Sequence, residues 1–136
     1  MATDLHSTSV TGVSPQGDTP ALVPELHNGD CLSRDEFERR YEAMPGVKKA
    51  ELIEGVVYMG SPVSTTNHGV PHAELIGWIA TYVANTPGTQ VADNATIRLD
   101  GDNEPQPDVF LRVLPDHGGR TRQDGKYTGG GPELVC

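Results

Sequence analysis

The chain has 136 residues with 19 acidic and 10 basic side chains, which gives a formal net charge of -9 at pH 7. This length can bury the core of one ordinary domain, and the acidic excess argues against a protein that coats nucleic acid through its overall field. No apolar run approaches the roughly 18 to 20 residues that span a bilayer, and the first residues lack a signal-peptide pattern, so we expect a soluble cytoplasmic protein with no membrane partner.

Residues 1–28 predict a disordered tail, because they are rich in Ser, Thr, Pro and Gly and show no apolar period. We expect the folded domain over residues 29–136. Its first element is a short amphipathic helix in the segment LSRDEFERRYEAMPG, where Ser33 and Glu36 have the spacing of a capping box. The apolar face of this helix is formed by Phe37, Tyr41 and Met44.

A hairpin and a longer helix are predicted next. The segment KKAELIEGVVYMGSP is typical of two short strands with a tight turn at Glu54-Gly55. The segment HAELIGWIATYVAN predicts the central helix, from Pro71 to the break at Pro87-Gly88. Its apolar stripe is formed by Leu75, Ile76, Ile79 and Val83, with Trp78 and Tyr82 beside it.

The last part of the chain combines strands with polar segments. TQVADNATIRL and PDVFLRVL predict two strands separated by the polar turn DGDNEPQ. Every other residue from Val109 to Val113 is aliphatic, so one face of the second strand should pack and the other should look outward. Residues 115–131 carry many turn formers and predict a long loop. The run PELVC predicts a further strand, and because the sequence ends inside it we expect a domain that is incomplete at its C-terminus.

Four carboxylates in and after the polar turn are candidate ligands of a hard cation. They are Asp100, Asp102, Glu104 and Asp108. Because the turn lacks the glycine and the distal glutamate of an EF-hand loop, we expect Asp100 and Asp102 to be solvated. Asp108 opens an apolar strand, where rigid backbone would hold its carboxylate, and both a metal ligand and an ordinary strand-start residue agree with that place.

Other familiar site patterns are incomplete in this sequence. His68 and His72 have the spacing of two zinc ligands on one helix face, but Pro71 lies between them and the H-E-x-x-H pattern is absent. The sequence has no P-loop and no G-x-S-x-G elbow. Cys31 and Cys136 have no CxxC spacing, so we expect reduced thiols.

The order of the pieces is more specific than any one of them. It combines the segments EFERRYEAMP, KKAELIEGVVYMGSPVS, HGVPHAELIGWIATYV, DNATIRLDGDNEPQPDVFL and GGGPELV. Together they resemble the Uma-two family of the PD-(D/E)XK nuclease superfamily, from about residue 29 to the end. The resemblance implies an α/β fold of the α+β type, with a mixed sheet flanked by helices and a restriction-endonuclease-like core.

The same resemblance implies a metal-dependent DNA endonuclease that uses Mg²⁺ or Mn²⁺. Asp108 matches the aspartate of the family's Pro-Asp motif, a catalytic residue and metal ligand, and Glu51 matches a glutamate near the catalytic site. Gln106 and His72 are expected as neighbours in the cleft. DNA is the implied partner, and a homodimer is a candidate assembly.

The family's second acidic ligand and its lysine would follow the strand that begins with PELV. We therefore expect this 136-residue chain to be inactive, because a hydrolytic nuclease needs both the cation and a donor that neutralises the phosphate. The alternative is a non-catalytic remnant, or a DNA- or protein-binding module, that keeps the nuclease fold. DNA nicking that is lost in Asp108→Ala would favour the enzyme.

Overall fold

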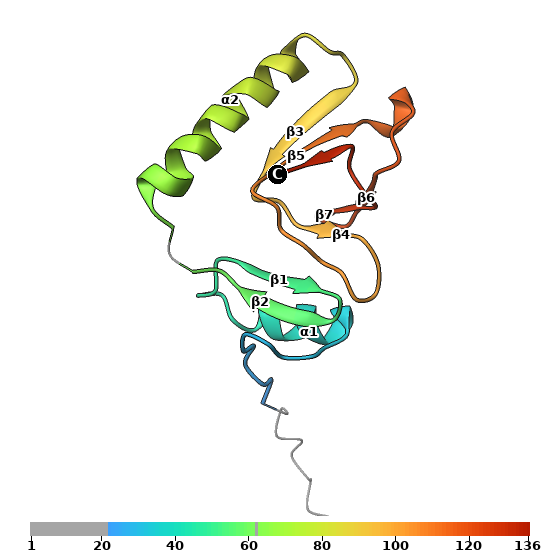
Figure 1. The fold of residues 1–136 in the computed structure, drawn as a ribbon. Helices are drawn as coiled ribbons and strands as arrows, with labels where there is room; N and C mark the ends of the chain where they lie inside the picture. Colours follow the sequence, from blue (N-terminus) through green and yellow to red (C-terminus); the bar gives the residue numbers. More distant parts are fainter. Residues whose placement is uncertain (1–21, 62) are drawn as a thin grey trace, which may run out of the picture.

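The computed structural model describes residues 22–61 and 63–136, which contain two α-helices and eight short strands (Figure 1). In chain order the elements are α1 (Arg34–Glu42), β1 (Ala50–Ile53), β2 (Val56–Met59), the π-helical turn η1 (Thr65–Gly69), α2 (Val70–Ala84), β3 (Thr89–Asp93), β4 (Ile97–Arg98), β5 (Val109–Val113), the 3-10 turn η2 (Pro115–His117), β6 (Arg122–Asp124), β7 (Tyr127–Gly129) and β8 (Leu134–Val135). No helix in these ranges is long and apolar enough to cross a membrane.

The strands form three small sheets with the orders β1-β2, β3-β5-β8 and β4-β7-β6. The first two are antiparallel, whereas β4 runs parallel to β7 and β7 antiparallel to β6. In Figure 1, α2 lies beside the β3-β5-β8 sheet, and α1 lies against the β1-β2 hairpin. The expected α+β class with a mixed sheet is confirmed.

The β1-β2 hairpin and α1 share one small core. Buried apolar side chains come from both elements and from the segment before α1: Leu26, Phe37, Ala50, Leu52 and Val57. Because Leu26 is only 3% exposed, the expected tail boundary at residue 28 is too late. The rest of that predicted tail, residues 1–21, lies outside the described residues.

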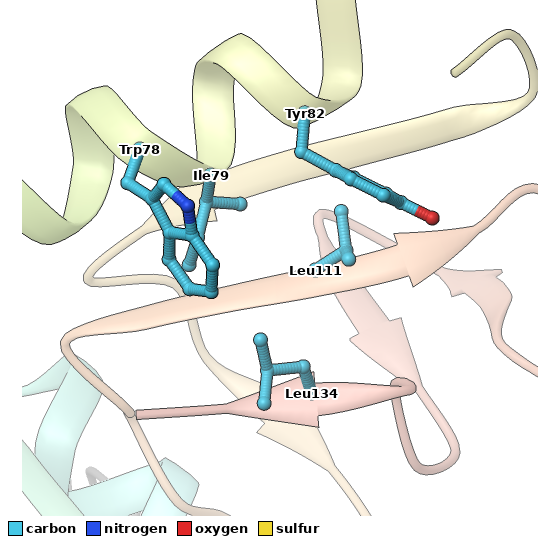
Figure 2. Close-up of a pocket in the computed structure, with 5 residues that line it drawn as sticks. All are labelled: Trp78, Ile79, Tyr82, Leu111 and Leu134. Carbon is cyan, nitrogen blue, oxygen red and sulfur yellow. The ribbon is translucent and has the colours of Figure 1, made fainter. Parts of the chain in front are cut away.

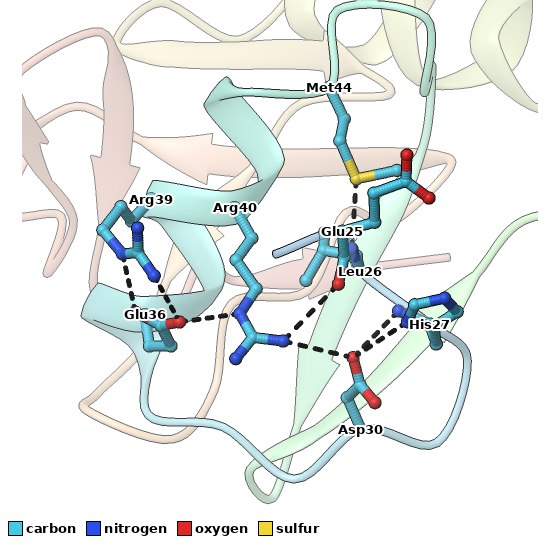
Figure 3. Close-up of polar contacts among 8 residues, drawn as sticks. All are labelled: Glu25, Leu26, His27, Asp30, Glu36, Arg39, Arg40 and Met44. Carbon is cyan, nitrogen blue, oxygen red and sulfur yellow. Dashed lines mark hydrogen bonds and ion pairs between the residues drawn. The ribbon is translucent and has the colours of Figure 1, made fainter. Parts of the chain in front are cut away.

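The start of α1 differs from the expected capping box. Ser33 occupies the N-cap, but its side chain makes no capping hydrogen bond. Glu36 instead accepts hydrogen bonds from Arg39 and Arg40 at 2.7 to 2.8 Å (Figure 3). Two guanidinium groups offer a carboxylate stronger, charge-assisted hydrogen bonds than one neutral backbone amide does. These bonds hold the pKa of Glu36 at about 2, and the capping-box prediction was wrong.

The hairpin turn has the predicted place. Glu54 and Gly55 have φ values of 51° and 75°, so both residues are in the left-handed region, as a two-residue turn of type I′ requires. This turn aligns Glu51 with Tyr58 and Ala50 with Met59 in the antiparallel register. The register buries Ala50 and Leu52 on one face of β1 and leaves Glu51 on the other.

The central helix α2 begins and packs as expected. Its first residues are Val70 and Pro71, and Ile79 on the predicted stripe is buried. The helix packs on β3 and β5, whereas Trp78 and Tyr82 stay 69% and 51% exposed. The stripe therefore faces the sheet, and the two aromatic side chains lie at the edge of this contact.

Two strand predictions were wrong in part. The segment TQVADNATIRL does not form one strand, because Asn94 has a φ of 46° and divides it into β3 and β4 of different sheets. In β5, Val109 and Phe110 are both buried, so both faces are covered at its start. Arg112 shares a face with Phe110 and donates a hydrogen bond to Thr128 of β7 at 3.5 Å. That face therefore packs toward the third sheet instead of looking outward.

The predicted loop over residues 115–131 contains a second hairpin. Strands β6 and β7 turn at Gly125-Lys126, and Asp124 pairs with Tyr127. The Asp-Gly sequence is a known hairpin signal, but the short flanking strands have no apolar alternation to strengthen it. The final run forms β8, which pairs with β5 as a short strand.

Candidate functional site

An open cleft of about 1070 Å³ lies where the hairpin, the start of α2 and the start of β5 meet. Hydrophobic residues line it only in part, and its polar lining brings together cations, imidazoles and carboxylates from segments far apart in the chain. The polar lining residues are Lys48, Lys49, Glu51, Ser61, His68, His72, Asn94 and Asp108. Two of the expected catalytic residues, Asp108 and Glu51, and the expected neighbour His72 therefore lie in one cleft.

Asp108 is the best-connected carboxylate of this cleft. Its Oδ1 accepts a hydrogen bond from Lys49 Nζ at 2.9 Å, and its Oδ2 lies 3.6 Å from Nδ1 of His68. Partial burial acts to raise the pKa of Asp108, but the hydrogen bond and charge of Lys49, with His68 and His72, outweigh it and lower the pKa. The carboxylate is therefore kept ionised at neutral pH.

Glu51 holds the segment that leads to Asp108. Its Oε1 accepts a hydrogen bond from the backbone N–H of Gln106 at 2.7 Å. The side chain of Gln106 turns elsewhere, and its Nε2 donates to the carbonyl oxygen of Asn94 at 2.8 Å. Gln106 thus contributes its backbone to the site, while its side chain lines a neighbouring pocket.

His68 and His72 lie together because the π-helical turn η1 continues directly into α2, with Pro71 in its first turn. Their ring centroids are 5.3 Å apart, because the π-helical turn η1 precedes α2 and carries His68. Nε2 of His72 lies 3.1 Å from the carbonyl oxygen of Asp108 and 3.1 Å from Oδ1 of Asp93. The two imidazoles therefore flank Asp108 on the α2 side of the cleft.

The other three candidate carboxylates do not join Asp108. Asp100 accepts hydrogen bonds from the backbone N–H of Asp102 and from Nδ2 of Asn103, so it closes its own turn. Glu104 is only 2% exposed and forms an isolated bridge with Leu52 through its backbone. The four candidate carboxylates therefore do not form one cluster, and Asp100 and Asp102 lie on an exposed turn as expected.

Glu104 is the buried member of a partly exposed ionic cluster between α1 and the third sheet. Nε of Arg98 donates to Glu38 at 2.7 Å and lies 3.9 Å from Oε2 of Glu104, while Nη1 lies 3.2 Å from Asp124. Arg34 lies 3.8 Å from Glu38 on the helix side. Burial, with the hydrogen bond and charge of Glu38, raises the pKa of Glu104 to about 8.

The residues of the cleft do not by themselves fit the expected Mg²⁺ or Mn²⁺ ion. In the described ranges 22–61 and 63–136, no group of three or more His, Cys, Asp or Glu side chains is arranged to hold a metal. One oxygen of Asp108 already binds the Lys49 ammonium, and one oxygen of Glu51 binds a backbone amide. A hard cation needs about six oxygen ligands, so these two carboxylates could supply only part of a site.

A second pocket, of about 260 Å³, lies between α2 and the β5-β8 pair (Figure 2). Its lining is almost wholly apolar: Trp78, Ile79, Tyr82, Leu111 and Leu134. The phenol of Tyr82 is the one polar side-chain group besides the indole N–H among these lining residues. Both cysteines, Cys31 and Cys136, are free and exposed, as expected.

Sequence reasoning named Asp108 and Glu51 but did not connect three residues near them with that pair, and it considered His68 only beside His72. Lys49, His68 and Asp93 come from a pre-strand segment, a π-helical turn and the end of β3. No spacing in the sequence links them, because tertiary contacts alone bring these segments together. The paired lysines before the ELI segment were the one local signal, and the sequence favours solvated surface for them.

The comparisons with known proteins agree with this arrangement of elements. The family model Uma2, described as "Putative restriction endonuclease", matches residues 34–136. A search of curated proteins finds no match. The matched range begins with α1 and includes each of the cleft residues named above.

Proposed function

Because the chain belongs to the Uma2 family of restriction-endonuclease-like proteins, we propose that it acts on DNA and hydrolyses phosphodiester bonds in the cleft around Asp108. The observation that carries the proposal is the meeting of Asp108 and Glu51 with Lys48 and Lys49 in one open cleft. A phosphodiester brings negative charge, and ammonium groups are suitable partners for it. The carboxylates can accept a hydrogen bond from a water molecule or bind a cation.

The local charge of the cleft supports a polyanionic substrate despite the net charge of the chain. Lys48 and Lys49 lie side by side in the sequence and both line the cleft, and His68 and His72 add two potential hydrogen-bond donors. A chain with a net charge of -9 repels DNA at long range, so contact depends on these few groups. We therefore propose weak and strongly salt-dependent DNA binding.

We further propose that cleavage requires Mg²⁺ or Mn²⁺ and that this 136-residue chain has little or no measurable turnover. The Lys49 hydrogen bond to Asp108 and the incomplete ligand set among the described residues support this low activity. Loss of one preorganised electrostatic partner typically slows catalysis by about 10² to 10³-fold. Long incubations at high protein concentration are therefore needed to detect nicking.

The test is plasmid nicking with Mg²⁺ or Mn²⁺, with EDTA as the blank. Asp108→Ala should abolish the slow nicking, because it removes the carboxylate at the centre of the cleft. Asp102→Asn is the matched control: it removes one acidic charge from the exposed turn and should leave the rate unchanged. Equal nicking by wild type and Asp108→Ala would refute the assignment of the site.

The alternative is a binding module that keeps the fold without the chemistry. It is favoured by the same hydrogen bond, because a carboxylate that is bound to lysine is less available to a cation. Fluorescence anisotropy with a labelled duplex separates the two proposals. DNA binding without any nicking would favour the module, whereas nicking that depends on Asp108 would exclude it. The homodimer stays a prediction, which light scattering can test.

A further inference from the structure

We propose that a pocket beside Tyr127 binds an unpaired base of the DNA whose phosphates lie in the cleft around Asp108, so that the chain prefers single-stranded DNA to duplex. The inference rests on the proposed function and names the substrate class of the same site. This Tyr127 pocket has a volume of about 330 Å³, within the range of about 300 to 1000 Å³ that small-molecule sites occupy. Its lining residues are Asn94, Ala95, Thr96, Gln106, Lys126, Tyr127 and Thr128.

The Tyr127 pocket adjoins the cleft around Asp108. Asn94 lines both hollows, and its backbone N–H donates to the carbonyl oxygen of Asp108 at 3.0 Å. The carbonyl oxygen of Asn94 accepts a hydrogen bond from Nε2 of Gln106 at 2.8 Å, so the wall between the two hollows is held from both sides. A nucleotide next to a phosphate in the cleft therefore has the Tyr127 pocket directly beside it.

Tyr127 offers the pocket an aromatic ring that the fold holds in place. The residue is half-buried, and the guanidinium carbon of Arg98 lies 4.6 Å from the centre of its ring. Arg98 is itself fixed, because it donates hydrogen bonds to Glu38 at 2.7 Å and to Asp124 at 3.2 Å. A base that stacks on a ring fixed in this way does not have to order it first.

The polar groups of the pocket suit the edge of a base. Asn94 and Gln106 carry side-chain amides with both donors and acceptors, and Thr96 carries a hydroxyl. Oε1 of Gln106 is buried and has no hydrogen-bond partner among the described residues. The edge of a base presents the same mixture of donors and acceptors. A small movement of the Gln106 amide would therefore give its oxygen the donor that it lacks.

Lys126 adds a cation to the lining of the pocket. Its side chain is 69% exposed, and Nζ lies 5.0 Å from the centre of the Tyr127 ring and 4.0 Å from Glu42. Such exposed contacts stabilise a protein little, so the ammonium group can turn to a DNA phosphate. Proteins that bind single strands without reading their sequence combine cationic groups for the backbone with aromatic rings for the bases. Lys126 and Tyr127 provide this combination beside Lys48 and Lys49 of the cleft.

Base pairing decides between single strand and duplex. In a duplex, each base is stacked on its neighbours and its Watson–Crick edge is paired, so a base reaches a pocket only after unstacking and unpairing. An unpaired base has its edge free and can stack on an aromatic side chain. The ring and the amides of the Tyr127 pocket therefore favour single-stranded DNA over duplex.

The first measurement is fluorescence anisotropy of the 136-residue chain in EDTA with three labelled probes. The probes are a short oligothymidylate, an abasic deoxyribose-phosphate chain with the same number of phosphates, and a duplex of the same length. The wild type should bind the oligothymidylate about 5- to 100-fold more tightly than the abasic chain, which is the effect of one stacked base. The duplex should bind more weakly than the oligothymidylate. Equal affinities for the oligothymidylate and the abasic chain, or tighter binding of the duplex, would overturn the proposal.

The second measurement compares variants with the same probes. Tyr127→Leu should lower the affinity for the oligothymidylate by about 5-fold or more and leave the affinity for the abasic chain unchanged. Tyr127→Phe keeps the ring and should bind as the wild type does. Tyr82→Leu is the matched control, because Tyr82 is a half-exposed tyrosine that lines the apolar pocket at α2. An equal loss for both probes in Tyr127→Leu, or the same loss in Tyr82→Leu, would refute the assignment of the pocket.

A third measurement needs no substitution, so it holds even if Tyr127→Leu fails to fold. An abasic chain that carries 2-aminopurine as its single base is titrated with the wild type. The fluorescence of this base should fall on binding, because stacking on an aromatic ring quenches it, whereas unchanged fluorescence would overturn the proposal. Absence of nicking would sink the proposed cleavage alone, because the probes are compared in EDTA and decide base binding separately.

Discussion

The buried carboxyl of Glu104 offers a sharp test of the packing between α1 and the third sheet. Its pKa is raised from the ordinary value of 4.5 to about 8, by burial and by the adjacent Glu38. The charged groups that face it are Glu38 and Arg34 from α1, Arg98 from β4 and Asp124 from β6. Glu104→Gln keeps the shape and a hydrogen-bond donor for Glu38 but cannot titrate.

The sign of the effect follows from the raised pKa. Below pH 4.5 Glu104 is protonated in both states, and between pH 4.5 and about 8 only the folded state keeps the proton. The contribution of Glu104 to the free energy of unfolding is therefore fully present below pH 4.5 and is lost as the pH rises through about 8. The shift of the pKa from 4.5 to about 8 corresponds to about 5 kcal/mol in the free energy of unfolding, at about 1.36 kcal/mol for each pH unit. Because the titration of Glu104 depends on the charge of the adjacent Glu38, we expect the free energy of unfolding to fall by about 2 to 4 kcal/mol between pH 5 and pH 8.

The assay is urea denaturation of the full chain at pH 5, 6, 7 and 8, followed by circular dichroism. Relative to Glu104→Gln, the wild type should lose about 2 to 4 kcal/mol in free energy of unfolding over this range. The comparison removes the contributions of titrating groups that Glu104 does not contact. Glu74→Gln on the exposed face of α2 is the control and should follow the wild type. If the free energy of unfolding changes with pH in the same way in wild type and Glu104→Gln, the raised pKa of Glu104 is refuted.

Three further predictions concern packing. Leu52→Ala should lower the free energy of unfolding by about 2 to 5 kcal/mol in urea, because Leu52 is fully buried in the hairpin core, and a loss below about 1 kcal/mol would contradict that placement. Gly119→Ala should lower the melting temperature, because the added Cβ would collide with the carbonyl oxygen of Val113. An unchanged melting temperature would refute the close approach of Gly119 to that carbonyl. Ile79→Ala should lower the free energy of unfolding by about 2 to 4 kcal/mol, whereas Trp78→Ala should lower it by less than about 1 kcal/mol because Trp78 is 69% exposed. Equal losses in urea would contradict the orientation of α2.

The elements with strong local signals were predicted well. Glu54-Gly55 can adopt two positive φ values in sequence, which made the hairpin visible without any tertiary information. The stripe around Ile79 has the helical period, and the family resemblance linked Asp108 with Glu51 before any geometry was known. The structure brings both carboxylates into one cleft, and their catalytic role stays a prediction.

Local signals failed where neighbouring segments supplied the partners. Ser33 and Glu36 satisfy the capping-box spacing, yet two arginines one turn later compete for the glutamate. The strand expected through Asn94 divides there because its two halves pair in different sheets. The β6-β7 hairpin was missed because its strands gain stability from pairing with β4, which their own sequence does not show.

The sequence by itself determined the class of fold, the family and one turn geometry, because each depends on the order and local period of residues along the chain. Only the tertiary structure decided what Asp108 contacts, since Lys49 and His68 come from segments that no spacing rule connects to it. The same holds for Glu38 and Glu104, which lie 66 positions apart in sequence, because burial of Glu104 beside Glu38 raises the pKa of Glu104. Charge interactions act through space and depend on burial, so they appear only when the chain is folded.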